Sequence, residues 1–423
     1  MSMFRNLAAR CSRTVVHACT SPRMARLLGE PLYSVFWFRR GRTALSLATV
    51  KSILVVRLDE LGDVVLFTPF LRELRRNAPQ AWIGLVVKPA VRNLVELCPY
   101  VNQVFTFDLE SDNGRWPPLT RHWRTLKFGW RHCWSRRLDL AISPRRTADA
   151  KRGIFLMYFS GANWRAAYTW SNSINEQGRP QGEDALLTHP FQCRAGHHEV
   201  EDNLQFLRLL GGDVKSPALE LWITNDEKRF GDTEILALGE NNRRPVIAIG
   251  PGAFAPERIW PLENFLSVAQ FSVQELGSRI VIIGGADDKI RGETIARQVG
   301  SRCLNLAGQT TFRQTAALLS KCSVFVGNDS GPMHIAAAMS VPVVEISSYP
   351  RGGWFDHPRS PARFGPWQVP KIILQPEQSL APCQGFCAAT FPHCITQVSV
   401  EQVRQAICQL LVSTGSCPAP TCS

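Results

Sequence analysis

Two blocks of the chain alternate short apolar runs with amphipathic stretches, and this alternation constrains the fold more than any other feature. β-Branched runs predict strands at 52–57, 81–87, 103–107 and 138–143 in the first block, and at 246–250, 279–283, 323–327 and 341–346 in the second. Helical periodicity covers 63–77 and 198–210 in the first block, and 261–276, 288–299, 312–321 and 331–339 in the second. Strands that alternate with helices form parallel sheets through right-handed crossovers. The sequence therefore predicts an α/β protein with two Rossmann-like halves.

The same pattern divides the 423 residues into five parts. We expect a basic N-terminal arm (1–50), a first Rossmann-like domain (51–210), an interdomain segment (211–244), a second Rossmann-like domain (245–375) and a Cys-rich C-terminal segment and tail (376–423). Gly211 and Gly212 mark the end of the first domain, since glycine is common just after a helix. Ligands of such folds bind at the carboxyl ends of the strands, so we expect the site in the cleft between the halves.

The net charge of +13 lies in two segments. Residues 1–50 hold eight arginines and one glutamate, and residues 115–152 hold eleven basic and two acidic residues, while the rest is slightly acidic. Several tryptophans interleave with the second segment, which suits a docking surface for a phosphorylated glycolipid on an anionic membrane. A solvated helix face is the alternative there, and a disordered tail is the alternative to membrane attachment for the arm. Arg145 and Arg146 follow a strand, so we expect them to face the acceptor.

No apolar stretch reaches the roughly 20 residues of a membrane span, and Arg5, Arg10 and Arg13 interrupt any signal-peptide core. We therefore expect a cytoplasmic protein, peripheral to the cytoplasmic face of the inner membrane.

The loop after the first strand, from Arg57 to Asp63, contains three carboxylates and one glycine. Asp63 is a good helix N-cap residue, and this structural role is one interpretation. It is also a candidate general base. Because a helix N-terminus favours an ionised carboxylate, Asp63 needs no raised pKa for that role.

The second block has three loops suited to a nucleotide. In 250–261, Gly252 permits close approach of the backbone and Arg258 can grip a phosphate. In 284–288, Asp287 or Asp288 can approach a ribose or simply cap the next helix. These loops contain no Asp-x-Asp pair, in agreement with a reaction that needs no metal.

The loop 327–334 is the most informative of the three. Asp329 and Ser330 can cap a helix whose first turn holds Pro332. The free N–H groups of that helix end suit a diphosphate, and His334 lies one turn further on.

Three motifs together resemble glycosyltransferase family 9, the ADP-heptose:lipopolysaccharide heptosyltransferases. They are Leu-Asp-Glu-Leu-Gly-Asp-Val-Val-Leu-Phe-Thr-Pro (58–69), Pro-Gly-Ala…Arg-Ile-Trp-Pro (251–261) and Asn-Asp-Ser-Gly-Pro-Met-His-Ile-Ala-Ala-Ala (328–338). They follow the family's order and spacing, and the resemblance extends over about 51–407. The helix that begins His198-Glu-Val-Glu-Asp-Asn also looks like one in the family.

The resemblance implies a GT-B fold, with two Rossmann-like domains facing across a cleft, and an inverting, metal-independent transfer of heptose from ADP-heptose to a lipopolysaccharide core. Carried over by position, Asp63 is the catalytic base and Arg258 contacts the donor phosphates. The remaining donor-binding residues that it implies are Gly252, Asp287, Asp288, Asp329, Ser330, Gly331, Pro332, Met333 and His334. No cofactor is expected for catalysis.

Six of the thirteen cysteines lie between Cys383 and Cys422. Cys383, Cys387 and Cys394, with His393 or Cys408, could hold a structural Zn or Fe ion, while a loop with free thiols is the alternative. The spacing matches no standard zinc knuckle.

Other functions remain open at this stage. The same fold could use another nucleotide-sugar donor or a protein acceptor, or could be a nucleotide-sugar epimerase. A nucleic-acid binder is the alternative from another class, although the distribution of charge favours phosphorylated lipid over nucleic acid.

Overall fold

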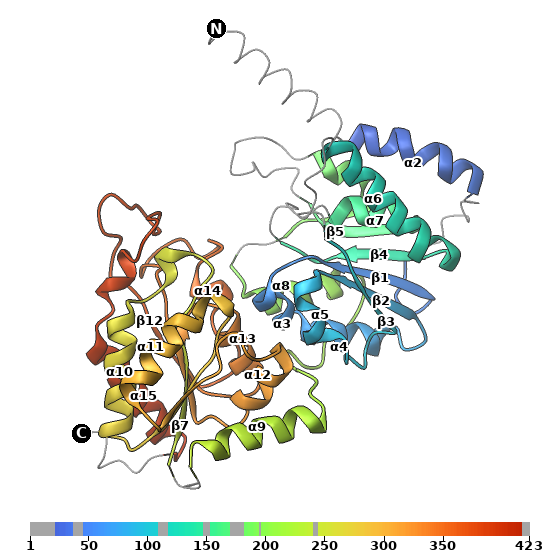
Figure 1. Ribbon diagram of the computed structural model, residues 1–423. Coiled ribbons are helices and arrows are strands. Elements are labelled where there is room, and N and C mark those ends of the chain that lie inside the picture. The colour runs from blue at the N-terminus through green and yellow to red at the C-terminus, as the bar shows by residue number, and fades with distance from the viewer. Residues whose placement is uncertain are drawn as a thin grey trace.

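The computed structural model describes residues 22–36, 45–108, 117–146, 153–169, 182–193, 196–239 and 244–416 (Figure 1). The strands of the first half are β1 (Ser52–Arg57), β2 (Trp82–Val87), β3 (Gln103–Thr106), β4 (Leu140–Ser143), β5 (Trp164–Tyr168) and β6 (His189–Phe191). Those of the second half are β7 (Val246–Gly250), β8 (Arg279–Ile282), β9 (Cys303–Asn305), β10 (Val324–Asn328), β11 (Val343–Ile346) and β12 (Lys371–Leu374).

Helices cover both sheets. The first half contains α2 (Pro22–Phe36), α3 (Leu61–Val65), α4 (Thr68–Asn77), α5 (Arg92–Val95), α6 (Pro117–His132), α7 (Gly153–Phe159) and α8 (Glu199–Leu209). The chain continues through α9 (Asn225–Ala237), α10 (Leu262–Gln274), α11 (Lys289–Val299), α12 (Phe312–Leu319), α13 (Gly331–Ala338), α14 (Pro361–Phe364) and α15 (Val400–Ser413). None of the helices in the described ranges is long and apolar enough to cross a membrane.

The predicted pair of Rossmann-like halves is confirmed. The first sheet has the order β3-β2-β1-β4-β5-β6 and the second β12-β11-β10-β7-β8-β9, with every pairing parallel. Read from the first strand of each half, both sheets follow the same doubly wound order. In each sheet the direction of winding reverses next to that first strand, between β1 and β4 and between β7 and β10. These reversals are the points at which such sheets bind ligands.

The predicted helix over 63–77 is wrong in detail. Two helices, α3 and α4, replace it, and α4 starts at Thr68 with Pro69 in its first turn. Proline has no N–H to donate and its ring clashes with the preceding turn, which disfavours a continuous helix here and suits Pro69 to the first turn of α4. As a result Asp63 is not the N-cap residue of α3. Glu60 occupies that position, and Asp63 lies in the first turn.

Strands β5, β6, β9 and β12 were not predicted. They are three to five residues long, and none of the residues of β6 or β9 is fully buried. A short, half-exposed strand lacks the continuous apolar run that identifies a central strand in a sequence.

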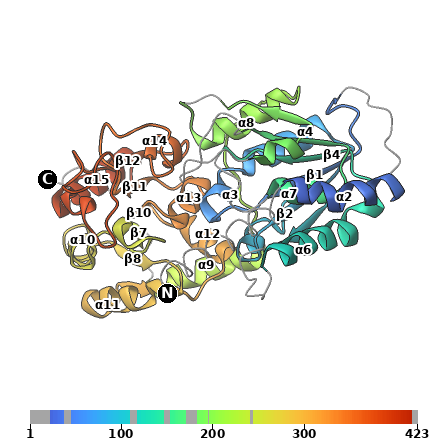
Figure 2. The same ribbon diagram turned by 90° about the horizontal axis from the view of Figure 1, so that it is seen from above.

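Helices α9 and α15 attach the remaining chain to the second half. Helix α9 packs against α12, and α15 packs against α10 and three strands of the second sheet. Val403, Ile407 and Leu411 of α15 are completely buried in the hydrophobic core of the second half. The two halves meet where α3 packs against α13 (Figure 2). The loops at the two reversal points are therefore brought together.

Candidate active site

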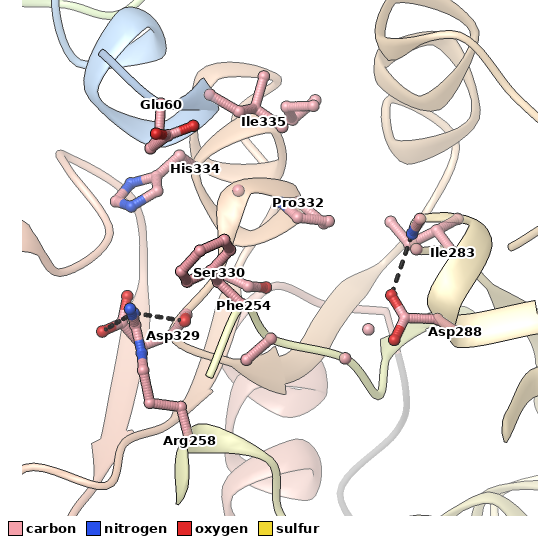
Figure 3. Close-up of a pocket in the computed structure, with 18 of the residues that line it drawn as sticks. Glu60, Phe254, Arg258, Ile283, Asp288, Asp329, Ser330, Pro332, His334 and Ile335 are labelled. Atoms are coloured by element: carbon pink, nitrogen blue, oxygen red, sulfur yellow. Dashed lines mark hydrogen bonds and ion pairs between the residues drawn. The ribbon is translucent and has the colours of Figure 1, made fainter. Parts of the chain in front are cut away.

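A cavity of about 910 Å³ lies between the halves, at the reversal points of both sheets. The loop after β1 and Arg145 after β4 line it from the first half. The loops after β7, β8 and β10 line it from the second half, and Figure 3 shows the residues of these loops around it. Most of the candidate residues therefore converge on one pocket. They are Asp63, Arg145, Gly252, Arg258, Asp287, Asp288, Asp329, Ser330, Gly331, Pro332 and His334.

Asp63 is the carboxylate that faces this pocket from the first half. Its side chain keeps 30% of its surface exposed, although protein surrounds it closely on the other sides. Arg57 lies 4.0 Å from its Oδ1 atom. The first-turn position in α3 brings Asp63 close to α13, because α3 and α13 pack together.

The pKa of Asp63 is raised, which corrects the sequence-based expectation. Burial, together with the neighbouring Asp59 and Glu199, raises it to about 7, although Arg57 opposes them. A carboxylate with a pKa near neutrality is a stronger base than an ordinary aspartate and is still ionised at slightly alkaline pH. The favourable position in the first turn of a short helix does not outweigh burial beside two other carboxylates.

A buried network of charged residues lies behind Asp63. Arg57 is 1% exposed and its Nη2 atom contacts Glu199 at 3.0 Å. The other oxygen of Glu199 accepts a hydrogen bond from Arg363 Nη2 at 2.9 Å. Burial alone would raise the pKa of Glu199, but Arg363 and Arg57 together hold it below its usual value. Because Arg57 belongs to β1 and Arg363 to α14, Glu199 joins the two halves through two guanidinium groups.

No motif in the sequence singled out Arg57, Glu199 or Arg363 as functional residues. A charged residue at the end of the apolar run 52–56 was the only signal for Arg57. An arginine that ends a strand buried on both faces requires an acidic partner, and only the tertiary structure identifies it.

Arg145 and Arg146 have different environments. Arg145 lines the pocket and pairs with Asp59. Arg146 is largely buried and does not line this pocket, and its role in acceptor binding stays a prediction. It pairs instead with Asp202 at 2.8 Å and with Asp356 of the second half at 2.5 Å. The guanidinium of Arg146 is paired with one carboxylate from each half, so it joins the halves.

Arg258 is held against the second half of the pocket. Its Nη2 atom lies 2.5 Å from Asp329 Oδ2 and donates a hydrogen bond to the Asp329 carbonyl at 2.7 Å (Figure 3). Asn328 fixes the loop that carries Arg258, since its side chain accepts from Trp260 N–H and donates to the carbonyls of Pro251 and Gly252. The loops after β7 and β10 are thus locked to each other, with a guanidinium between them.

Three buried polar atoms around this loop pair have no hydrogen-bond partner among the described residues. They are Arg258 Nε, Ser330 Oγ and His334 Nδ1. Ser330 is the N-cap residue of α13, but its side chain makes no capping hydrogen bond, which corrects the capping role expected for it. Burial lowers the pKa of His334 to about 4, so the ring is neutral at physiological pH. Buried polar groups are normally paired, so these atoms and the N–H groups of α13 point to a polar or anionic ligand.

Other predicted donor-binding residues divide into two groups. The side chain of Met333 is completely buried in the hydrophobic core and does not line the pocket, and its contact with the donor stays a prediction. Asp287 and Asp288 both line the pocket. Asp288 accepts a hydrogen bond from Gly285 N–H at 3.0 Å, and a Cβ on Gly252 would lie 1.9 Å from its Oδ1 atom. Gly252 is therefore required for the close approach of two pocket loops.

Phe254 is a pocket residue that the sequence did not single out. Its side chain is 98% exposed, although it lines the cavity between Gly252 and Arg258 (Figure 3). An aromatic ring exposed at the edge of a polar pocket offers a flat apolar surface to a bound ligand.

A second cluster lies outside the pocket. Cys383, Cys387, His393 and Cys394 bring their ligand atoms within 4.8 Å of one another. Three thiols and one imidazole form a donor set that could bind a metal ion. Cys383, Cys387 and Cys394 form no disulfide with one another.

Comparison with known proteins identifies the fold and the family. A glycosyltransferase family 9 protein from Veillonella parvula superposes with a TM-score of 0.69 at 22% identity, over 88% of this chain and all of that chain. The ADP-heptose lipopolysaccharide heptosyltransferase II of Escherichia coli superposes with a TM-score of 0.63, also at 22% identity, over 86% of this chain and 99% of that chain. Lipopolysaccharide heptosyltransferase 2 of Salmonella typhimurium is 27% identical over 304 residues, which is 70% of this chain and 82% of that protein.

Two parallel six-stranded sheets with a pocket between their reversal points define the GT-B fold. The model of glycosyltransferase family 9 (heptosyltransferase) matches residues 156–386, more than half of the chain. The chain belongs to that family.

Proposed function

We propose that this protein transfers heptose from ADP-heptose to the core of lipopolysaccharide, with inversion at the anomeric carbon. The relative from Salmonella typhimurium is named for lipopolysaccharide heptose transfer, and the Escherichia coli structure is named for an ADP-heptose enzyme. One observation in the structure carries the proposal. The base Asp63 lies on one side of the pocket, and Arg258 with the N-terminus of α13 lies on the other.

This arrangement suits an in-line displacement. The acceptor hydroxyl gives its proton to Asp63 while its oxygen bonds to the anomeric carbon. The bond between that carbon and the diphosphate oxygen breaks, and ADP leaves with the electron pair. A positioned general base contributes about 10²–10⁴-fold to such a step. Arg258 and the N–H groups of α13 stabilise the negative charge on the departing diphosphate.

The proposal requires no metal ion in the chemical step, because these groups supply the positive charge at the leaving group. A structural zinc or iron ion at the Cys-rich segment would lie outside the reaction. Arg145, on the side of the pocket where Asp63 lies, is the basic residue available to a phosphorylated acceptor.

The direct test combines ADP-heptose with lipopolysaccharides truncated before and after their heptoses, and measures ADP release and the mass of the product. Wild-type protein is expected to add one heptose to one of these acceptors. Asp63→Asn is expected to lose transfer while binding ADP as the wild type does. The control Asp213→Asn removes an exposed carboxylate that pairs with Arg76 and should leave turnover unchanged.

Unaltered turnover of the Asp63→Asn variant would falsify the assignment of the base. No transfer to any of the lipopolysaccharides, with ADP-heptose still bound, would direct the search to a protein acceptor. Failure to bind ADP-heptose would point to another donor.

Helix α6 supports a second part of the proposal, attachment to an anionic membrane surface. Trp123, Lys127, Trp130 and Arg131 are all exposed and recur at helical spacing, so they share one face. The opposite face, with Thr125 and Phe128, is buried, and the helix contains no acidic residue. Tryptophan and basic residues on one helix face favour the interface of a negatively charged bilayer.

Vesicle flotation tests this attachment. Full-length protein is expected to float with vesicles that contain anionic lipid and to remain in solution with purely zwitterionic ones. Replacing Trp123 and Trp130 with serine should reduce flotation. The control Trp354→Ser removes a tryptophan that is equally exposed in the second half and should not. Equal flotation of both variants would exclude α6 as the contact. Trp116 and most of the basic arm lie outside the described residues.

A further inference from the structure

The Cys-rich segment has the geometry of a closed metal site. Cys387 and Cys394 are 1% and 0% exposed, and Cys383 and His393 are half-buried. His393 Nδ1 lies 3.6 Å from Cys383 Sγ and 3.5 Å from Cys394 Sγ. In a tetrahedral zinc site, metal–sulfur bonds of about 2.3 Å and metal–nitrogen bonds of about 2.0–2.1 Å place sulfur and nitrogen about 3.55 Å apart. Both distances to the imidazole nitrogen match this value, and all four donor atoms lie within 4.8 Å of one another.

Backbone N–H groups also point at the sulfur atoms. Ala388 N–H donates to Cys383 Sγ and Leu380 N–H donates to Cys394 Sγ, both at 3.4 Å. Such donors stabilise the thiolate form that a metal requires. Between β12 and α15 the segment has little regular structure apart from an isolated bridge of Gln384 with Phe386 and the short turn at Cys394. A segment with so little regular structure gains stability from a cross-link that fixes its conformation.

We propose that Cys383, Cys387, His393 and Cys394 bind one structural metal ion, zinc in the first instance, and that this ion holds the donor-binding loop in place. Soft thiolate ligands in a tetrahedral arrangement select zinc or iron over magnesium and calcium. Four protein ligands leave no open position for substrate, so the ion has a structural role.

One chain of contacts connects this site with the pocket. The carbonyl of Cys387 accepts a hydrogen bond from Arg359 Nη1 at 3.0 Å, and the same Nη1 atom lies 2.7 Å from Glu257 Oε1. Glu257 is buried and immediately precedes Arg258 in the short 3-10 helix η4 (Pro256–Arg258). This helix also contacts η6 (Cys394–Gln397), which begins at a ligand. Loss of the ion would therefore release the support of the loop that carries Arg258.

A ring stack provides a second connection. Phe386, between two of the ligands, stacks on His357 with centroids 4.8 Å apart, and His357 stacks on Tyr349 at 4.9 Å. The residue before His357 is Asp356, which pairs with Arg146 of the first half. The ion thus also stabilises one of the contacts between the halves.

Metal content is the first measurement. Full-length protein purified without chelator should contain about one zinc or iron ion per chain by elemental analysis. Cys394→Ser and Cys387→Ser should lose it, and Cys303→Ser, a half-buried free cysteine in β9, should keep it. Metal-free protein should regain the ion from added Zn²⁺ alone. A protein without bound metal, or one in which thiol titration finds two of these three cysteines in a disulfide, would overturn the proposal.

ADP affinity is the second measurement, and this part rests on the proposed donor site. Metal-free protein is expected to bind ADP about tenfold more weakly, and Zn²⁺ should restore the affinity. Arg359→Ala should retain the ion and still weaken ADP binding, with partial recovery in Arg359→Lys, because it removes the link between the Cys387 carbonyl and Glu257 but none of the four ligands. Because Arg359→Ala keeps the ion, it tests the support of the donor-binding loop even if removal of the ion unfolds the Cys-rich segment.

The outcomes separate the two proposals. If wild-type protein holds the ion but binds no ADP, the proposed function fails and the metal site stands. If ADP affinity is the same with and without the ion and in Arg359→Ala, the support of the donor loop is refuted.

Discussion

Gly62 lies directly against the imidazole of His334, at the contact of α3 with α13: a Cβ on Gly62 would lie 2.5 Å from His334 Cδ2. The two residues belong to opposite halves of the molecule. This contact brings Asp63, the next residue in α3, close to the loop that faces the donor diphosphate in the proposed reaction.

Gly62→Ala is therefore expected to impair transfer. The added methyl group must displace the buried ring of His334 or separate the halves. Such overpacking costs about 1–3 kcal/mol, which offsets or exceeds the roughly 1 kcal/mol by which alanine favours a helix over glycine. We expect turnover to fall on the order of tenfold or more, with an unchanged or lowered melting temperature. Steady-state kinetics with thermal unfolding checks this, and full activity would show that the halves do not need this close contact.

The raised pKa of Asp63 predicts the pH dependence of the reaction. Because the base must be ionised, kcat/KM should rise about tenfold per pH unit below its pKa of about 7 and become constant above it. An ordinary aspartate, with its pKa near 3.8, would give a flat profile from pH 5 upward. A flat profile would contradict either the role of Asp63 or its environment.

The raised pKa of Asp63 also predicts how the stability of the folded protein depends on pH. The folded state raises the pKa of Asp63, so it favours the protonated form. This contribution to stability is present below the unfolded value near 3.8 and is lost as the pH rises through about 7. Asp63→Asn should therefore have a higher melting temperature than the wild type at pH 8, and the difference should shrink at pH 5. A variant that melts earlier at pH 8 would indicate that Asp63 stabilises the fold.

Arg258 is expected to act on the donor and not on the acceptor. Arg258→Ala removes the guanidinium and leaves Asp329 without its partner at 2.5 Å, so ADP affinity should fall by about 10–100-fold. Arg258→Lys keeps the charge and should lose less. Calorimetry with ADP measures both, and the KM for the acceptor is the control that should change little. Equal ADP affinity in all three proteins would exclude Arg258 from the phosphate site.

Glu199→Gln should be one of the most destabilising single changes. It leaves Arg57 and Arg363 buried with their shared carboxylate removed, which costs about 3–5 kcal/mol in comparable buried pairs. The matched control Glu201→Gln changes an exposed residue of the same helix and should have little effect. Urea unfolding at pH 7 compares the two. Similar midpoints for both variants would show that the buried network contributes little to stability.

The repeating apolar runs were sufficient to predict the two parallel sheets, because a strand buried on both faces must be apolar along its length. They also predicted that the loops at 57–63, 250–261, 284–288 and 327–334 would carry the site, since the carboxyl ends of such strands bind ligands. Eleven candidate residues line one pocket as a result. The sequence offered Cys383, Cys387 and Cys394 with His393 or Cys408 as ligands, and the structure brings His393, rather than Cys408, into the cluster.

Only the tertiary structure decided the state and the partner of each charged group. Arg145 and Arg146 are adjacent in the sequence, yet one lines the pocket and the other joins the halves. The sequence alone identifies Asp63 as a possible base. Its raised pKa, however, arises from burial beside Asp59 and Glu199, which lie on separate elements. Local sequence determines which strand or helix forms through short-range periodicity. Burial and electrostatic interactions depend on distances between segments far apart in the chain, and these distances exist only in the folded protein.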